Sequence, residues 1–390
     1  MFTLSLRLFL LVFALAFAGC ASKPAKVSKP DIVIQPSAPA TQVHKKIAKP
    51  KLKPIPKPKP VIGLALVNSL LASKLADRSA WADDIYAAFR VINIPVNKKN
   101  VCAVLAEIEQ ESSFQVDPLV FGLNHIVRRE LEAGRQKYLI PQWVMEHSLE
   151  VTSPDGRSYN ERIAALKTES DVDRFFEDMI SEIPFGEKLF ADYSPVRTGG
   201  PMQVSWSFAH AYVANRPYPY PIKTSLRNEL FSRKGGLFFG VAYLLDYPAS
   251  YTSMRFRFAD FNAGIYSSRN AAFQNAVSSL SGTLLVTDGD LLRYRDGVAQ
   301  ETPSLTMRAI LSISARLNMD QTEIFRDLLL EKTPAFEQSR LFKKIFTMAA
   351  SLPSELIPEI ELRGPKLSRK LTTAMYVEQV ARRYDKCLKK

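Results

Sequence analysis

Three acidic side chains near the end of one predicted helix are the residues best suited to carry chemistry. Asn97 is placed to cap a helix whose apolar residues recur with helical spacing over residues 101–108. Glu111 borders this apolar stripe, whereas Glu107 and Glu109 lie further round the helix and are expected to be solvated surface charges. Because burial disfavours the charged form of a carboxyl group, a border position tends to raise its pKa. Glu111 is therefore the candidate general acid for a reaction near neutral pH.

A glutamate at a helix end is usually structural, so the case depends on three further segments that follow in order. Residues 108–114 contain Gln-Glu-Ser-Ser-Phe, and the other segments are Gly-Pro-Met-Gln-Val at 200–204, Gly-Val-Ala-Tyr-Leu at 240–244 and Ala-Asp-Phe-Asn-Ala-Gly at 259–264. Each segment alone could be only a loop, core packing or a helix end. The ordered set resembles the signature motifs of the lytic transglycosylases, the goose-lysozyme-like branch of the lysozyme superfamily.

This resemblance implies a fold, a reaction and a set of site residues. The fold would be a lysozyme-like helical domain, and the substrate would be the β-1,4 bond from N-acetylmuramic acid to N-acetylglucosamine in peptidoglycan. Glu111 would protonate the leaving oxygen and then, as a base, take the proton of the muramoyl C6 hydroxyl, which closes onto C1 to give a 1,6-anhydro product. The residues implied to bind the glycan are Ser112, Met202, Gln203, Tyr243, Phe261 and Asn262.

Two departures from the family pattern bear on activity. Residues 115–195 look like a long helical insertion that could form one wall of a cleft or a lid. Phe261 stands where the family has a tyrosine whose hydroxyl hydrogen-bonds the catalytic acid. Either Tyr266 or Tyr243 supplies that bond here, or the acid is less well tuned, or catalysis is lost.

Two other functions are therefore kept as alternatives. If Asp117 or Asp260 faces Glu111 across the cleft, the paired carboxyl groups of an ordinary glycosidase would allow hydrolysis, and the protein would be a muramidase. If catalysis is lost, the protein would be a peptidoglycan-binding scaffold for other cell-wall enzymes. The four histidines show no ligand spacing and no glycine-rich phosphate loop is present, so neither a metal ion nor a cofactor is expected.

The N-terminus is typical of an exported lipoprotein. Arg7 precedes an apolar run over residues 8–18, which is too short to span a bilayer and suits a signal peptide covering residues 1–19. The small residues before Cys20 resemble the bacterial lipobox, in which that cysteine is lipidated. Ala21 after the cysteine favours the outer membrane, with the globular part in the periplasm. The alternative is an ordinary cleaved signal that contains a cysteine.

The basic residues are concentrated in the segment that follows. The chain has a net charge of +13, and residues 21–62 contribute +9 of it through ten lysines and one acid, Asp31. Proline recurs among these lysines, so residues 20–62 are expected to be an extended tether from the lipid anchor. Because so little net charge remains on the rest of the chain, nucleic acid is not an expected partner.

Beyond the tether the pattern is helical, and the fold class is mainly α. A lysozyme-like catalytic domain is expected over residues 63–282 and a helical region over residues 283–390, with one small β-hairpin at residues 284–292, where Asp-Gly suits a tight turn. Segments 197–204 and 365–373 also resemble a Gram-negative lipoprotein family catalogued as a domain of unknown function, family 1615.

Two cysteines remain after Cys20. Cys387 lies on the apolar side of the predicted last helix, and Cys102 lies on the helix of Glu111. The periplasm permits disulfides. The two residues either form a disulfide that ties the last helix to the catalytic helix or are buried free thiols.

Overall fold

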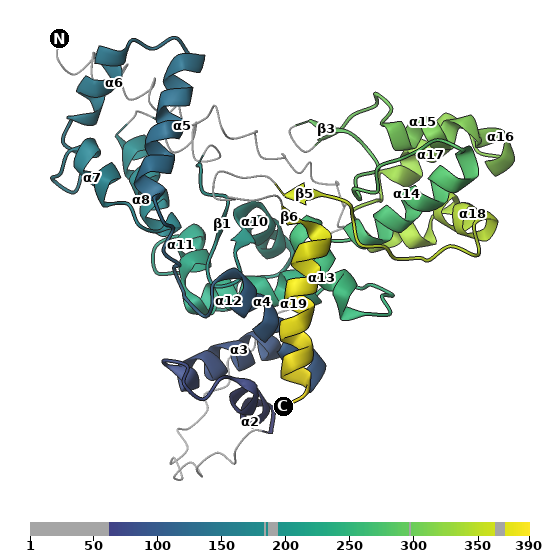
Figure 1. Ribbon diagram of the computed structural model, residues 1–390, viewed down its shortest axis with the longest axis horizontal. Helices are drawn as coiled ribbons and strands as arrows, with labels where there is room; N and C mark the ends of the chain where they lie inside the picture. Colours follow the sequence, from purple (N-terminus) through teal and green to yellow (C-terminus); the bar gives the residue numbers. More distant parts are fainter. Residues whose placement is uncertain (1–61, 183–184, 186–193, 296–297, 363–370) are drawn as a thin grey trace, which may run out of the picture.

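The structure is a computed structural model that describes residues 62–182, 185, 194–295, 298–362 and 371–390. The signal peptide, Cys20 and nearly all of the tether lie outside these residues. The described part is mainly helical, as expected, with short two-stranded antiparallel pairs. Figure 1 shows three groups of helices, a central group flanked by two lobes. None of the described helices is both long and apolar enough to cross a bilayer.

The central group is built around the predicted catalytic helix, α4. Asn97 caps it as predicted, because its Oδ1 accepts a hydrogen bond from the backbone N–H of Asn100 at 2.9 Å. The last helix, α19, packs along α4, although more than 260 residues separate Glu111 from Thr373 in the sequence. The helices of this group are α2 (Ile62–Leu70), α3 (Arg78–Ile92), α4 (Lys98–Glu111), α10 (Trp206–Asn215), α11 (Leu226–Phe231), α12 (Arg233–Leu245), α13 (Met254–Ala263) and α19 (Thr373–Leu388).

Helix α4 is buried on nearly every side, which the apolar stripe alone did not predict. All residues from Val101 to Ile108 are buried, Glu107 included. The prediction that Glu107 is a solvated charge is therefore wrong, because α19 covers the face of α4 that a helical wheel assigns to solvent. The same prediction is right for Glu109, whose side chain is 57% exposed.

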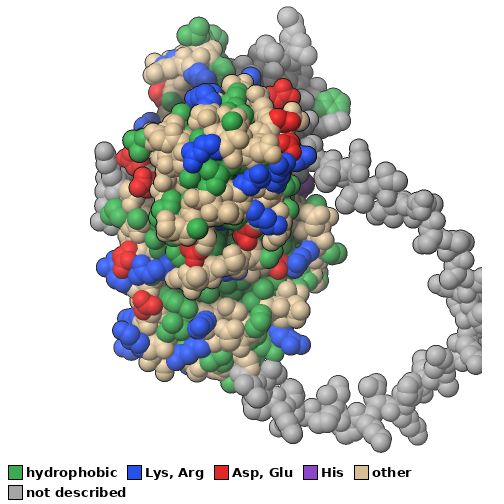
Figure 2. Space-filling view, turned by 90° about the vertical axis from the view of Figure 1, so that its right-hand side faces the viewer, with side chains coloured by type: hydrophobic (Ala, Val, Ile, Leu, Met, Phe, Trp, Pro, Cys, Tyr) green, Lys and Arg blue, Asp and Glu red, His purple; other side chains and the backbone are tan. Residues whose placement is uncertain are grey.

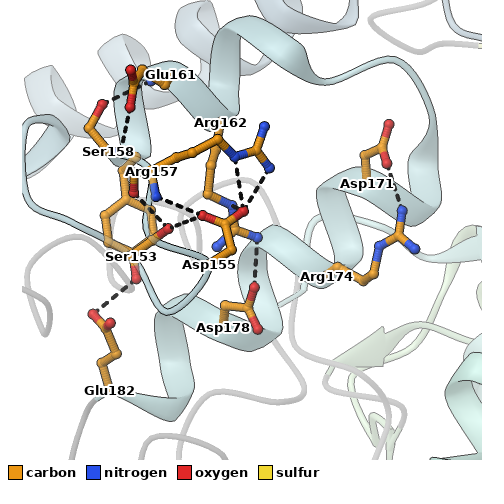
Figure 3. Close-up of polar contacts among 11 residues, drawn as sticks. Ser153, Asp155, Arg157, Ser158, Glu161, Arg162, Asp171, Arg174, Asp178 and Glu182 are labelled. Atoms are coloured by element: carbon orange, nitrogen blue, oxygen red, sulfur yellow. Dashed lines mark hydrogen bonds and ion pairs between the residues drawn. The ribbon is translucent and has the colours of Figure 1, made fainter.

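The insertion forms a lobe with its own apolar core, centred on residues such as Phe175, Phe176 and Met179. Its helices are α5 (Leu123–Lys137), α6 (Gln142–Leu149), α7 (Tyr159–Ala165) and α8 (Glu169–Ser181). Figure 3 shows the polar network beside this core: Arg162 of α7 forms ion pairs with Asp155, at 3.4 Å, and with Asp178, at 2.7 Å. The buried charge of Arg162 is thus matched by acids on two sides.

The third lobe is built from α14 to α18 and contains a capping box, in which the side chains of Asp320 and Glu323 each accept a hydrogen bond from the other's backbone N–H. Its helices are α14 (Ser267–Ser281), α15 (Leu305–Ser312), α16 (Ser314–Leu317), α17 (Gln321–Leu328), the 3-10 helix η2 (Pro334–Gln338) and α18 (Arg340–Met348). Buried side chains of α14, such as Phe273, belong to this core, and α19 belongs to the central one. A boundary at residue 282 would assign α14 to the central core and α19 to the third. The structure has the reverse for both helices.

The hairpin expected over residues 284–292 is not present as strands. The backbone turns at Gly289, with φ of +87°, but side chains of α14 bind this turn: Gln274 Oε1 accepts from the Gly289 N–H at 2.8 Å, and Asn270 Nδ2 donates to the Gly289 carbonyl at 3.1 Å. These bonds replace a partner strand. The strand pairs of the described chain are β1 (Thr198–Gly199) with β2 (Val204–Ser205), β3 (Tyr294–Arg295) with β4 (Val298–Ala299), and β5 (Glu361–Leu362) with β6 (Leu371–Thr372).

The face of the molecule that carries the third lobe shows how its charges are distributed. In Figure 2, Lys and Arg side chains are dispersed among hydrophobic and neutral ones, with acidic side chains between them. Among the described residues of this face, the basic side chains form no continuous stripe of the kind that tracks a nucleic-acid backbone.

Candidate active site

A pocket of about 330 Å³ lies where the C-terminal end of α4 meets the β1–β2 pair and helices α12, α13 and α19. Its volume falls within the range of small-molecule sites, about 300 to 1,000 Å³. The residues that line it are Glu111, Thr198, Gln203, Val204, Ser205, Tyr243, Phe261, Asn262 and Tyr376. The pocket thus joins residues from five parts of the chain that are far apart in sequence.

The structure brings most of the predicted site residues to this pocket. Glu111, Gln203, Tyr243, Phe261 and Asn262 line it. None of the described residues of the insertion does so, which means that the insertion forms no wall of this pocket within the described chain. One carboxyl group faces a cavity that otherwise presents aromatic rings, amides and hydroxyls.

Ser112 and Met202 were predicted to bind substrate but are buried behind the pocket wall. The Ser112 hydroxyl donates to the carbonyl oxygen of Pro201 at 2.8 Å, which ties the end of α4 to the loop that carries Gln203. Met202 packs against Gly240, where an added Cβ would lie only 2.3 Å from the Met202 sulfur. Both residues position the loop, and Gly240 allows its close approach.

The backbone at and beside the pocket adopts a left-handed conformation that residues other than glycine rarely adopt. Gln203 has φ of +50°, and Ser113 and Phe114, just after the catalytic helix, have φ of +51° and +61°. Left-handed backbone at such residues costs on the order of 1 kcal/mol or more, and this strain is commonly found at functional sites. The Gln203 side chain is fixed as well, because its Oε1 accepts from the Thr198 hydroxyl at 3.1 Å.

Aromatic rings and an oriented amide line the pocket together with the carboxyl group. Tyr243 packs edge-to-face with Phe261, with ring centroids 5.2 Å apart, and with Phe208 at 4.7 Å. Asn262 accepts at its Oδ1 from the Thr373 hydroxyl at 3.0 Å, so its amide nitrogen is the group that can donate to a ligand. Flat apolar rings beside amide groups suit a ligand with both apolar faces and polar edges.

Glu111 is held by a hydroxyl group that the sequence did not assign to it. The Tyr376 hydroxyl of α19 lies 2.6 Å from Glu111 Oε1 and also 2.6 Å from Glu107 Oε2. The expectation that Tyr243 or Tyr266 supplies this bond is therefore wrong. The Tyr243 hydroxyl interacts with the backbone of Ile265, and the backbone N–H of Tyr266 donates to Asp260 at 2.9 Å.

Burial raises the pKa of both glutamates. For Glu111, desolvation raises the pKa above its ordinary value, and the hydrogen bond from Tyr376 opposes this shift. For Glu107, desolvation raises the pKa further, and the neighbouring Glu111 carboxyl adds to the shift. Burial also raises the pKa of the Tyr376 hydroxyl well above 10.0, which keeps Tyr376 protonated as a donor. The direction for Glu111 is the one expected of a general acid.

No second acid lines the pocket beside Glu111 in the described chain. Asp260 is fully buried elsewhere and accepts hydrogen bonds from the hydroxyls of Tyr247 and Tyr251 at 3.0 and 2.7 Å, besides backbone N–H groups. Asp117 does not line the pocket either. Neither residue is placed as a partner carboxyl across the cavity. Among the described residues, no three His, Cys, Asp or Glu side chains lie close enough together to hold a metal ion.

Cys102 and Cys387 form a disulfide with Cα atoms 5.5 Å apart, the first of the two alternatives. It joins α4 to α19 at the ends remote from the pocket. With a rise of about 1.5 Å per residue, Glu111 lies roughly 14 Å along α4 from Cys102, and Tyr376 lies roughly 16 Å along α19 from Cys387. Antiparallel helices joined at these cysteines bring the two residues together. This pairing was the one signal in the sequence that could have found Tyr376. Thr198 and Val204 lie within the quoted segment 197–204 but were not predicted as site residues, and Ser205 lies just outside it.

Comparison with known proteins gives a family but no activity. The family model described as "Protein of unknown function (DUF1615)" matches residues 74–390. The Escherichia coli (strain K12) protein described as "Uncharacterized protein YaiW" is 42% identical over 343 residues, which cover 86% of this chain and 93% of that protein. No solved structure matches the chain.

Proposed function

This chain belongs to the family described as Protein of unknown function (DUF1615), and we propose that its globular part cleaves peptidoglycan glycan strands with Glu111 as the proton donor. The observation that carries the proposal is the convergence of Glu111, Gln203, Tyr243 and Asn262 on one pocket. These residues come from four segments that resemble lytic transglycosylase motifs. We further propose that the central helices form a lysozyme-like domain.

The chemistry of the pocket suits an amino-sugar chain. The rings of Tyr243 and Phe261 can pack against the apolar faces of sugar rings, and the amide of Asn262 can bind an acetamido group or a hydroxyl. Glu111 is half-buried at the pocket edge with a raised pKa, so its neutral form persists nearer to neutral pH than that of an ordinary carboxyl group. A neutral carboxyl group is the form that can protonate a glycosidic oxygen.

In the proposed reaction Glu111 protonates the oxygen that leaves from C1 of N-acetylmuramic acid. The acetamido group of the substrate stabilises the positive charge that develops at C1. The Glu111 carboxylate then accepts the proton of the C6 hydroxyl as that oxygen bonds to C1, which gives a 1,6-anhydro product and returns Glu111 to its acid form. The Tyr376 hydroxyl stabilises the intermediate carboxylate.

The solitary carboxyl group supports transglycosylation over hydrolysis. Retaining and inverting glycosidases ordinarily use two carboxyl groups that flank the bond, and here Asp117 and Asp260 are absent from the pocket lining. In transglycosylation a single carboxyl group acts first as the acid and then as the base, which fits a pocket whose lining includes one carboxyl group, that of Glu111. Hydrolysis by a muramidase-type reaction stays as an alternative that the products would identify.

We also propose that Cys20 carries the lipid anchor and that the lysine- and proline-rich tether lets the globular part reach the cell wall from the outer membrane into the periplasm. The alternative function is a non-catalytic scaffold that binds peptidoglycan and other cell-wall enzymes. Its main support was the loss of the tyrosine hydroxyl at Phe261. Tyr376 weakens that support, because it supplies a hydroxyl to Glu111.

The test is to incubate the purified full-length protein with peptidoglycan sacculi and to measure product masses. We expect 1,6-anhydro muropeptides from the wild type and release slowed by at least about 10²-fold in Glu111→Gln. Glu109→Gln is the matched control, because Glu109 lies on the same helix but is exposed. Products with a reducing end would show hydrolysis instead. Sedimentation with sacculi without any product would overturn cleavage in favour of the scaffold function.

A further inference from the structure

The Tyr376 hydroxyl makes two short contacts with one hydrogen. Its oxygen lies 2.6 Å from Glu107 Oε2 and 2.6 Å from Glu111 Oε1. Both are distances of O–H···O hydrogen bonds, and each bond needs its own hydrogen. A tyrosine hydroxyl supplies one. The second hydrogen must therefore belong to one of the two carboxyl groups, and at least one glutamate of the pair is uncharged.

The surroundings of Glu107 decide which carboxyl group carries that hydrogen. Glu107 is 0% exposed, and its Oε1 is buried without a hydrogen-bond partner among the described residues. If Glu107 were ionised, this oxygen would be anionic and bare in an apolar core, which costs far more free energy than a neutral carbonyl oxygen in the same place. Glu111, in contrast, lies at the pocket edge. The hydrogen therefore belongs to Glu107.

The charged and titratable groups that face Glu107 compensate a negative charge on it only in part, because burial outweighs the effects of Tyr376 and Arg383. They are Glu111 on its own helix and Tyr376 and Arg383 on α19. Glu111 would repel the charge. Arg383 forms its ion pair with the exposed Glu109, at 4.0 Å, and forms none with Glu107 in the described chain. The geometry thus gives a chain of three oxygens in which the hydrogens run in one direction.

We propose that Glu107 is a protonated, uncharged acid that donates to the Tyr376 oxygen and thereby commits the single hydrogen of Tyr376 to Glu111. This inference rests on the proposed role of Glu111 and makes Glu107 a positioning residue for it. Because Tyr376 donates to Glu111 Oε1, the acidic proton of Glu111 is left for its other oxygen, Oε2. If Tyr376 instead donated to Glu107, Glu111 would have to donate its proton to the Tyr376 oxygen, and that proton would not be available to a ligand.

The proton on Glu107 can be measured without any substrate. The full-length protein is labelled with glutamate carrying ¹³C in the side-chain carboxyl group, and the signals are followed over pH. The Glu107 signal is the one missing from Glu107→Gln, and the signal missing from Glu109→Gln is the exposed control. We expect the Glu107 signal to keep its protonated position well above the pH at which an ordinary glutamate loses its proton, about 4.3.

A Glu107 signal that titrates near the ordinary glutamate value of about 4.3 would overturn the proposal. Should Glu107→Gln fail to fold, Tyr376→Phe identifies the signal instead, because it removes the hydroxyl that contacts both carboxyl groups and displaces those two signals. If the wild type does not cleave sacculi, the proposed function fails, but this titration still decides where the proton lies.

The pH dependence of cleavage gives a second readout with a distinct sign. Glu107→Leu removes the donor to Tyr376, which weakens the hydrogen bond from Tyr376 to Glu111. We expect slower cleavage, and we expect the alkaline limb of the pH profile, where activity falls as Glu111 loses its proton, to move to higher pH. Glu107→Gln keeps an uncharged donor and restores the limb towards its wild-type position. If Glu107 were instead ionised, both variants would remove a repelling charge and displace the limb to lower pH, which contradicts the proposal.

Discussion

The acidic side chains of the ion-pair network in the insertion lobe and those at the pocket have contrasting surroundings. In the lobe, Asp155 and Asp178 form ion pairs with the buried Arg162, and hydrogen bonds from the Arg157 side chain hold the pKa of Asp155 well below its usual range. At the pocket, Glu111 on the lining and Glu107 buried behind it form no ion pair within the described chain, and burial raises both pKa values.

The difference separates a structural role from a chemical one. Matched charges hold Asp155 in its ionised form, which cannot donate a proton at neutral pH. Unmatched acids make the folded state less stable as they become ionised, and this destabilisation is the condition for a proton donor near neutral pH. Substitutions in the two regions should therefore affect activity and stability in opposite proportions.

The largest expected effect is on catalysis and is confined to the pocket. Glu111→Gln removes the proton donor and should slow sacculus cleavage by about 10² to 10⁴-fold, the usual contribution of general acid–base catalysis, with an unchanged melting temperature. Asp155→Asn, in the lobe, should leave cleavage per folded molecule within about twofold of the wild type and lower the melting temperature. Equal losses of activity in both variants would remove the distinction between the regions.

The next effect concerns the disulfide that links the two helices of the pocket, α4 and α19. The Cys102–Cys387 disulfide closes a loop over a sequence separation of 285 residues and holds α19, which carries Tyr376, against α4. Replacement of both cysteines by serine should lower the free energy of unfolding by about 2 to 4 kcal/mol. Amide hydrogen exchange should accelerate in α19 and stay unchanged in α7 and α8. Uniform acceleration would show that the effect of the disulfide is not local.

A smaller loss is expected from the lobe network itself. Arg162→Met leaves Asp155 and Asp178 without their shared cation, whereas the apolar stem still packs near Phe175. A buried pair that loses one partner costs about 3 to 5 kcal/mol, but both acids here are about one-third exposed, so about 2 kcal/mol is expected. Urea unfolding, followed by hydrogen exchange in α7, measures it. Exchange in α4 should not change.

The smallest effects are slopes of stability against pH, and they have opposite signs. Glu107 has a folded pKa raised above 4.5, so its contribution is full below that pH and is lost as the pH rises towards the folded value, by about 1.4 kcal/mol per pH unit. Asp155 has a folded pKa below 3.8, so its contribution is lost as the pH falls below that value. Urea unfolding of Glu107→Gln should lack the first slope alone.

The sequence predicted the local features well. The cap at Asn97 depends on neighbours within a few residues, and the structure confirms it. Five of the seven site residues that the four ordered motifs implied line the pocket, whereas Ser112 and Met202 do not. Each of these features is encoded in a short segment.

The failures concern contacts between distant segments. Glu107 was placed in solvent because a helical wheel does not include α19, and the hydroxyl for Glu111 was sought in nearby motifs although Tyr376 lies 265 residues away. The turn at Gly289 was predicted as part of a hairpin from its local sequence. The hydrogen bond that holds it comes from Gln274 of α14, a tertiary contact that the local sequence does not show. Only the cysteine pair carried long-range information, and it pointed to α19.

The most direct test of the central claim is the pH dependence of sacculus cleavage by the wild type and Tyr376→Phe. Loss of the hydroxyl removes a bond that favours ionised Glu111, so its pKa should rise. We predict a wild-type alkaline limb above the ordinary value of a glutamate, displaced to higher pH and with slower cleavage in Tyr376→Phe. Cleavage that is absent from the wild type at every pH, or a limb that Tyr376→Phe leaves in place, would contradict the account.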